Sequence, residues 1–148
     1  MNAVQPLAGT APLAQADRLL RSPKDLHEHA LVVRALWEGL GPLCEEIRVA
    51  DRPGLREAGP VVHLHTPITG RLRQGVDLLH VAQRLHPSPA VGGWPSSAAR
   101  AYLEARDPEP EGLYRGLVGE LRPSGDGELH VALRLAHVRP DGARLWAG

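Results

Sequence analysis

Hydrophobic and polar residues alternate in the segment Val61–Thr66, and this alternation predicts a β-strand. Successive side chains of a strand point to opposite faces. Val62 and Leu64 therefore share one face, and His63 and His65 share the other. The apolar pair is expected to pack into the core, which places the two histidines on the face that is open to other chemistry.

Helical spacing follows this strand. We expect the strand to end by Gly70, and apolar residues then recur three or four positions apart, which predicts a helix over Val76–Leu85. The loop HPSPAVGGWP comes next, and its prolines and glycines fix the backbone and allow a ligand to approach closely. A further helix is expected over Pro95–Arg106. A strand with a histidine, a helix and a small-residue loop together predict the wall of a pocket.

The first half of the chain contains a clear helix start. Ser22 is suited to the N-cap, Pro23 to the first helical position, and Asp25 to the return bond of a capping box. The helix is expected to run to Leu43, with a buried apolar stripe formed by Val32, Leu36, Leu40 and Leu43. We interpret Val4–Ala8 as the end of a strand, Ile47–Val49 as a short strand, and residues 51–60 as a polar connection.

The last third of the chain indicates a β-meander. Strands are expected over Leu113–Leu121, Glu128–Val138 and Arg144–Ala147, separated by turns at Gly125-Asp126-Gly127 and Pro140-Asp141-Gly142. Antiparallel strands that follow a group of helices are typical of the α+β class.

Composition narrows the possible functions. The 148 residues suit one domain, and 17 basic and 17 acidic residues leave no basic surface for nucleic acid. The single cysteine, Cys44, excludes an internal disulfide and a cysteine-based zinc site. No apolar run is long enough to span a membrane, so we expect a cytoplasmic protein without a membrane partner.

Five segments, in order, resemble the chorismate-utilising enzymes, most closely the isochorismate synthases. They are PLAGTAP, S-KD--EHALVV, VVHL-TPI-GRL, LHPSPAVGG-P and Y-G-VG…GDGE--VALR…AG. The resemblance implies an α+β chorismate-binding fold with antiparallel sheets and helices on the outer face. It covers nearly all of residues 1–148, but only the second part of that catalytic domain, without the N-terminal portion and the C-terminal helix. A further expected partner is therefore the missing part of the same domain.

Two carboxylates are candidate metal ligands. Asp25 and Glu28 are three residues apart and share one face of the predicted helix, which suits a hydrated cation such as Mg²⁺. Capping alone explains Asp25, and both residues also complement the helix dipole. The resemblance implies that Glu28 is the magnesium ligand. His27 and His29 point in different directions and are interpreted as surface or packing residues.

The resemblance also assigns residues to the substrate, chorismate. Gly9 and Thr10 are expected to donate to the substrate's carboxylate, and the side-chain carboxylate is expected to be held by Tyr114, Arg134 and Gly148. His63 is expected to polarise or orient the substrate, and Ala90 favours water over ammonia as nucleophile. A guanidinium binds a carboxylate through two parallel hydrogen bonds. Because Arg134 interrupts an apolar run, leaving it there without a partner is expected to be costly.

The implied reaction is the Mg²⁺-dependent conversion of chorismate to isochorismate, by attack of water at C2 and loss of the C4 hydroxyl. It needs a general base and a general acid. The family's base is a lysine, but the only lysine here, Lys24, lies in the helix of Glu28. We therefore expect this chain alone to be inactive and marginally stable or self-associating. The alternatives are a salicylate, anthranilate or aminodeoxychorismate synthase, and a degenerate, non-catalytic carboxylate-binding module. The pathway, for menaquinone or a siderophore, stays open.

Overall fold

The computed structural model describes residues 4–6, 12–58, 61–106 and 112–146. The helices are α1 (Pro12–Arg21), α2 (Pro23–Leu40), the 3-10 turn η1 (Gly41–Leu43), α3 (Leu78–Leu85), α4 (Pro89–Gly92) and α5 (Ser96–Arg106). The strands are β1 (Val4–Pro6), β2 (Cys44–Val49), β3 (Gly54–Ala58), β4 (Val61–His65), β5 (Ile68–Leu72), β6 (Leu117–Leu121), β7 (Gly127–Val131), β8 (Ala136–Arg139) and β9 (Gly142–Leu145).

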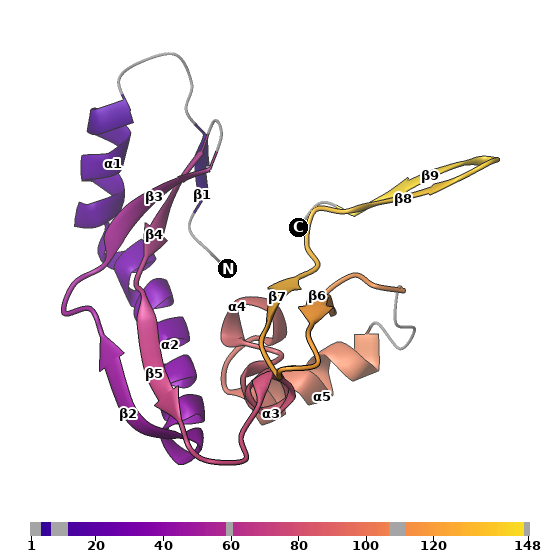
Figure 1. The fold of residues 1–148 in the computed structure, drawn as a ribbon. Coiled ribbons are helices and arrows are strands. Elements are labelled where there is room, and N and C mark those ends of the chain that lie inside the picture. Colours follow the sequence, from indigo (N-terminus) through magenta and orange to yellow (C-terminus); the bar gives the residue numbers. More distant parts are fainter. Residues whose placement is uncertain (1–3, 7–11, 59–60, 107–111, 147–148) are drawn as a thin grey trace.

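All described strand pairs are antiparallel, in the orders β1-β4-β3, β2-β5, β6-β7 and β8-β9. Helices α1 and α2 lie along the strands of the N-terminal half, and α3, α4 and α5 lie beside β6 and β7 (Figure 1). The β8-β9 hairpin extends away from the other elements (Figure 1). The α+β class with antiparallel sheets and flanking helices is therefore confirmed.

The core lies between α1 and β4. Leu19 is 1% exposed, and Val62 and Leu64 are buried beside it, with Leu20, Leu26 and Leu55 packed around them. The alternation predicted for β4 is confirmed, since Val62 and Leu64 enter the core while His63 is half-buried and His65 is exposed. The strand thus presents its histidines away from the core.

The N-cap predicted for helix α2 is present. The Ser22 side chain accepts a hydrogen bond from the Asp25 backbone N–H at 3.3 Å, and Pro23 occupies the first turn. The α-helix ends at Leu40 and continues only as the 3-10 turn η1, because Pro42 lacks the N–H that the helix would need. The predicted stripe is only half-buried, and Gly39 is the residue of α2 that is buried.

The sequence predicts that a strand ends by Gly70, but this residue lies in the middle of β5, opposite Ile47. A side chain at this position would come within 2.9 Å of the Cys44 sulfur. Gly39 has a similar role, because a Cβ there would lie 2.7 Å from the Leu85 side chain of α3. Glycine at these positions lets the chain pack closely, and this requirement outweighs its weak preference for strands and helices.

Further elements differ from the sequence prediction. Helix α1 occupies a segment for which the sequence predicted no element, and β3 occupies part of the expected polar connection. Strand β3 forms because Leu55 lies opposite Leu64 and joins the core. The long strand predicted for Glu128–Val138 is divided into β7 and β8. It breaks near Arg134, whose φ of 50° is left-handed and incompatible with a continuous strand.

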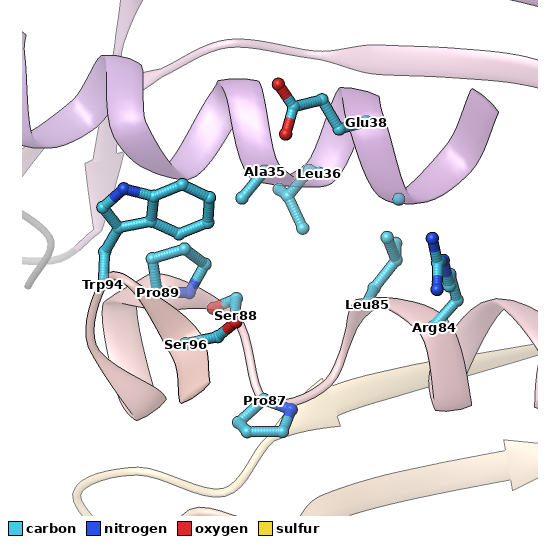
Figure 2. A pocket seen from close by; sticks show the side chains of 11 residues that line it. Ala35, Leu36, Glu38, Arg84, Leu85, Pro87, Ser88, Pro89, Trp94 and Ser96 are labelled. Carbon is cyan, nitrogen blue, oxygen red and sulfur yellow. The ribbon is translucent and has the colours of Figure 1, made fainter. Parts of the chain in front are cut away.

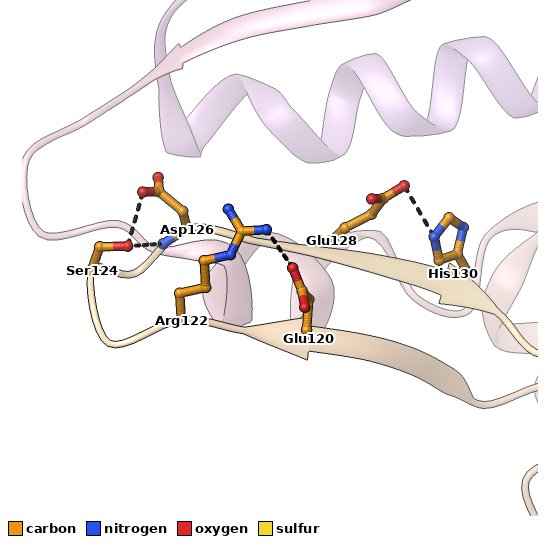
Figure 3. A network of polar contacts seen from close by, with 6 residues as sticks. All are labelled: Glu120, Arg122, Ser124, Asp126, Glu128 and His130. Carbon is orange, nitrogen blue, oxygen red and sulfur yellow. Dashed lines mark hydrogen bonds and ion pairs between the residues drawn. The ribbon is translucent and has the colours of Figure 1, made fainter.

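The β6-β7 hairpin has one polar face. Both predicted turns are present, and around the first the Ser124 hydroxyl donates to Asp126 at 2.9 Å. Figure 3 shows Arg122 directed at Glu120, and Glu128 directed at His130 at 3.0 Å. The opposite face carries Leu117, Leu121, Leu129 and Val131 in register.

Among the described residues, every helix is too short or too polar to span a membrane.

Because the core is small, a single substitution in it should have a clear effect on the free energy of unfolding. Replacing Leu19, the most buried large side chain described, with alanine should lower the free energy of unfolding by about 3 kcal/mol. Urea unfolding followed by circular dichroism measures this. The matched control is Leu79→Ala, because Leu79 is 51% exposed and should lose well under about 1 kcal/mol. Equal losses for the two variants would contradict the position of the core.

Candidate functional site

The positive charge of Arg134, in the β7–β8 connection, acts on His63 of β4. Burial lowers the pKa of His63, and the positive charge of Arg134 lowers it further. The imidazole is half-buried and the guanidinium is exposed. A neutral ring beside a fixed cation can donate or accept a hydrogen bond while the cation attracts an anion. The positive charge near His63 therefore favours an anionic ligand over a cationic one.

The backbone around Arg134 is fixed on both sides. The N–H of Arg115 donates to the carbonyl of Ala132 at 2.8 Å, and the N–H of Ala132 donates to Gly116 at 2.9 Å. On the other side, the N–H of Trp146 donates to the carbonyl of Leu135 at 2.9 Å. Arg134 lies between these anchored residues, in the left-handed conformation. Its expected place inside an apolar strand is wrong, and because its side chain is exposed the cost of burial does not apply.

Tyr114 joins the same region through Trp146. The two rings stack with centroids 6.3 Å apart and planes 17° from parallel, and the Arg115 guanidinium lies 5.3 Å from the Tyr114 centroid. Since Trp146 is also bonded to Leu135, the aromatic pair connects Tyr114 to the residue that follows Arg134. Stacking thus connects Tyr114, which precedes β6, to the connection between β7 and β8 that carries Arg134.

The candidate metal ligands lie at the start of α2. Glu28 has a side chain that is 35% exposed, with its Oε1 4.0 Å from the Lys24 ammonium, and Asp25 is half-buried one turn earlier. His29, the residue after Glu28, is hydrogen-bonded through Nε2 to the Thr66 hydroxyl at 2.8 Å. Thr66 directly follows β4, so this bond holds the first turns of α2 beside the strand that carries His63.

The carboxylates of Glu28 and Asp25 are suitable magnesium ligands, but they are too few to complete the coordination shell. Magnesium in proteins takes one or two carboxylates and completes its shell with water or substrate oxygens. Glu28, with Asp25 one turn away, can supply that share. In the part of the chain that the structure describes, no three His, Cys, Asp or Glu side chains are grouped as a complete metal site. Any further protein ligands must come from residues outside this group.

Ala90 lies in α4, within the predicted small-residue loop. Next to it, a cavity of about 260 Å³ lies between α2 and residues 84–96, and its lining includes Pro89 and Trp94 (Figure 2). A larger cavity of about 920 Å³ lies between α3 and α5 and is lined by Val91 and Tyr114. Of the predicted site residues in the described chain, Tyr114 is the one that lines these cavities. Figure 2 shows that the smaller cavity is closed on one side by α2.

The remaining predicted residues, Gly9, Thr10 and Gly148, lie outside the described residues. The described site residues fall into two groups, with Ala90 in neither. The charge of Arg134 acts on His63, and stacking connects Tyr114 to the connection that carries Arg134. Glu28 and Asp25 lie on the helix that His29 ties to the end of β4. Ala90 lies beside the helices that line the two cavities.

Sequence reasoning missed two supporting residues. His29 was interpreted as a surface or packing residue, yet it is hydrogen-bonded to Thr66, and Trp146 was given no role. One signal was present for Trp146, because the chain holds only three tryptophans and two tyrosines. In a chain so poor in aromatic residues, a tryptophan beside predicted site residues is a candidate support for them. His29 offers no such signal, since its partner is 37 residues away.

The His29–Thr66 bond makes a testable contribution. His29→Ala should lower the free energy of unfolding by about 1 kcal/mol, because it removes a half-buried hydrogen bond. A double-mutant cycle with Thr66→Ala should give a coupling energy of about 0.5–1 kcal/mol, measured by urea unfolding. The control is His27→Ala on the exposed side of the same helix. Strictly additive effects of His29→Ala and Thr66→Ala would show that the bond does not form.

Comparison with known proteins gives consistent matches along the chain. Residues 4–148 match the sequence model of the family described as "Chorismate binding enzyme". The chain is 44% identical over 138 residues to the salicylate biosynthesis isochorismate synthase of Pseudomonas aeruginosa. That alignment covers 93% of this chain and 29% of the relative.

Two solved structures share the fold. The menaquinone-specific isochorismate synthase MenF of Escherichia coli superposes with a TM-score of 0.85 at 25% identity, over 97% of this chain and 33% of that one. Anthranilate synthase component I of Streptococcus pneumoniae superposes with a TM-score of 0.80 at 26% identity, over 88% of this chain and 31% of that one. The chain thus spans about a third of the length of these relatives.

Proposed function

The chain belongs to the chorismate-binding enzyme family, and from this premise we propose that it forms one wall of an isochorismate synthase site. The single observation that carries the proposal is that the charge of Arg134 acts on His63, while Tyr114 is connected through Trp146 to Leu135, the neighbour of Arg134. The proposed reaction is attack of water on C2 of chorismate with loss of the C4 hydroxyl. The Pseudomonas relative, named as an isochorismate synthase, supports this product.

Each residue has a proposed task. Arg134 donates a pair of hydrogen bonds to the side-chain carboxylate of chorismate, and the Tyr114 hydroxyl and the Gly148 N–H donate to the same group. Gly9 and Thr10 are proposed to donate to a carboxylate of the substrate. His63, kept neutral by its lowered pKa, orients the substrate by hydrogen bonding. The small Ala90 leaves space for water beside the attacked carbon.

Glu28, assisted by Asp25, is the proposed share of a magnesium site. Bound Mg²⁺ would supply charge stabilisation to a carboxylate of the substrate. The general base and general acid are proposed to come from the rest of the catalytic domain, since about two thirds of the relatives' length lies outside this chain. We therefore expect no turnover by these 148 residues alone.

A composite protein tests the proposal. In it, this chain replaces the matching segment of the Pseudomonas aeruginosa relative, which supplies the remaining length. With chorismate and Mg²⁺ it should form isochorismate, identified by chromatography, whereas the isolated chain should not. Formation of salicylate or anthranilate instead would identify another chorismate-utilising reaction. Binding of chorismate without any product would favour a non-catalytic carboxylate-binding module.

A further inference from the structure

The β8-β9 hairpin has one entirely apolar face. Ala136 is paired with Leu145 and Val138 with Ala143, so these four side chains lie on the same side of the ribbon. His137, Arg139 and Arg144 lie on the other side. This strict alternation is the pattern of a strand pair that buries one face and solvates the other.

In the described structure the apolar face is open to solvent. Val138 is 75% exposed and Leu145 is 74% exposed, more than any other large apolar side chain among the described residues. The hairpin projects from the rest of the molecule (Figure 1). A two-stranded ribbon without further packing is marginally stable in water. The sequence of the β8-β9 hairpin therefore suits packing against a surface that the described residues do not provide.

We propose that this apolar face, formed by Ala136, Val138, Ala143 and Leu145, is the docking surface for the rest of the catalytic domain. The length of the relatives indicates the occupant, because about two thirds of each relative lies outside the matched segment while the fold of that segment is kept. The cationic face stays outside, towards solvent. The identity of the docked partner rests on the proposed function.

Docking at this face also sets the substrate-binding groups. Arg134 stands two residues before β8, and the base of the hairpin is held by the bond from the Trp146 N–H to the Leu135 carbonyl at 2.9 Å. Trp146 in turn stacks on Tyr114. A hairpin that is seated on the rest of the domain therefore fixes the position of Arg134 and Tyr114. Assembly and carboxylate binding are coupled through the base of the ribbon.

Cysteine labelling measures whether the face is covered. Val138→Cys and His137→Cys place the same thiol on the apolar and the cationic face of one strand, at adjacent positions. Each variant is treated with iodoacetamide in the isolated chain and in the composite protein, and the peptides are quantified by mass spectrometry. The native thiol of Cys44 is buried and stays unreactive while the protein is folded, which provides an internal control.

In the isolated chain both variants should react at similar rates. In the composite protein, Val138→Cys should react at least about tenfold more slowly than His137→Cys. A composite protein that Val138→Cys unfolds, while His137→Cys does not, supports the same conclusion. Equal rates in the folded composite protein would overturn the inference. Protection of Val138→Cys in the isolated chain that grows with protein concentration would also overturn it, because the occupant would be a second copy.

The labelling result does not depend on catalysis. A composite protein that protects the face but makes no isochorismate would refute the proposed reaction and leave the docking surface standing. A composite protein that makes isochorismate while the Val138→Cys thiol stays freely reactive would refute the docking surface and support the proposed reaction.

Discussion

Replacing Arg134 with glutamine in the composite protein should lower kcat/KM for chorismate by about 100-fold. Loss of a charge-assisted, two-point contact to a carboxylate removes on the order of 2–3 kcal/mol of binding. Arg134→Lys keeps the charge without the fork and should recover only part of that loss. Steady-state rates of isochorismate formation measure the effect.

The control for Arg134→Gln is Arg139→Gln. Arg139 is an exposed arginine of β8 on the cationic face of the same hairpin, so its replacement should change kcat/KM by less than about twofold. Equal effects at the two positions would mean that general positive charge, and no specific contact, attracts the substrate.

Glu28→Gln should cause a loss of at least about 100-fold in kcat at limiting Mg²⁺, because a neutral amide is a poor magnesium ligand. Raising the Mg²⁺ concentration should restore part of the activity. This partial rescue separates metal binding from a structural defect. Initial rates across a magnesium titration of the composite protein provide the measurement.

Glu38→Gln is the matched control, since Glu38 lies further along α2 and is paired with Arg34 at 2.7 Å. It should leave the magnesium dependence unchanged. A normal magnesium titration in Glu28→Gln would remove Glu28 from the metal site and leave the roles of Arg134 and His63 untouched.

Local patterns predicted much of the fold. The period of two in β4, the Ser22 cap of α2 and the two glycine-containing turns act over a few residues, and each is present as predicted. Non-local packing determined what was missed. Strand β3 exists because Leu55 meets Leu64 in the core, and Gly70 stays in a strand because it packs closely on Cys44. Neither contact can be inferred from neighbouring residues.

The site shows the same division. Motif resemblance selected His63, Tyr114 and Arg134, and their joint role in one site stays a prediction, supported by the charge of Arg134 at His63 and by the Tyr114–Trp146 stack. The residues that position them, His29 and Trp146, act through partners that are distant in sequence or carry no motif. Arg134 also lies in a left-handed turn and not in a strand, because the backbone break between β7 and β8 depends on the pairing of both hairpins.

The influence of the Arg134 charge on His63 is tested most directly by the pKa of His63, measured by NMR titration of the histidine rings with His63→Gln used for assignment. In the native chain the pKa should lie below the usual histidine value, mainly because of burial, and Arg134→Gln should raise it by removing the nearby positive charge. Arg139→Gln should leave it unchanged. A His63 pKa that is the same with and without the Arg134 charge would show that the two residues do not share a site.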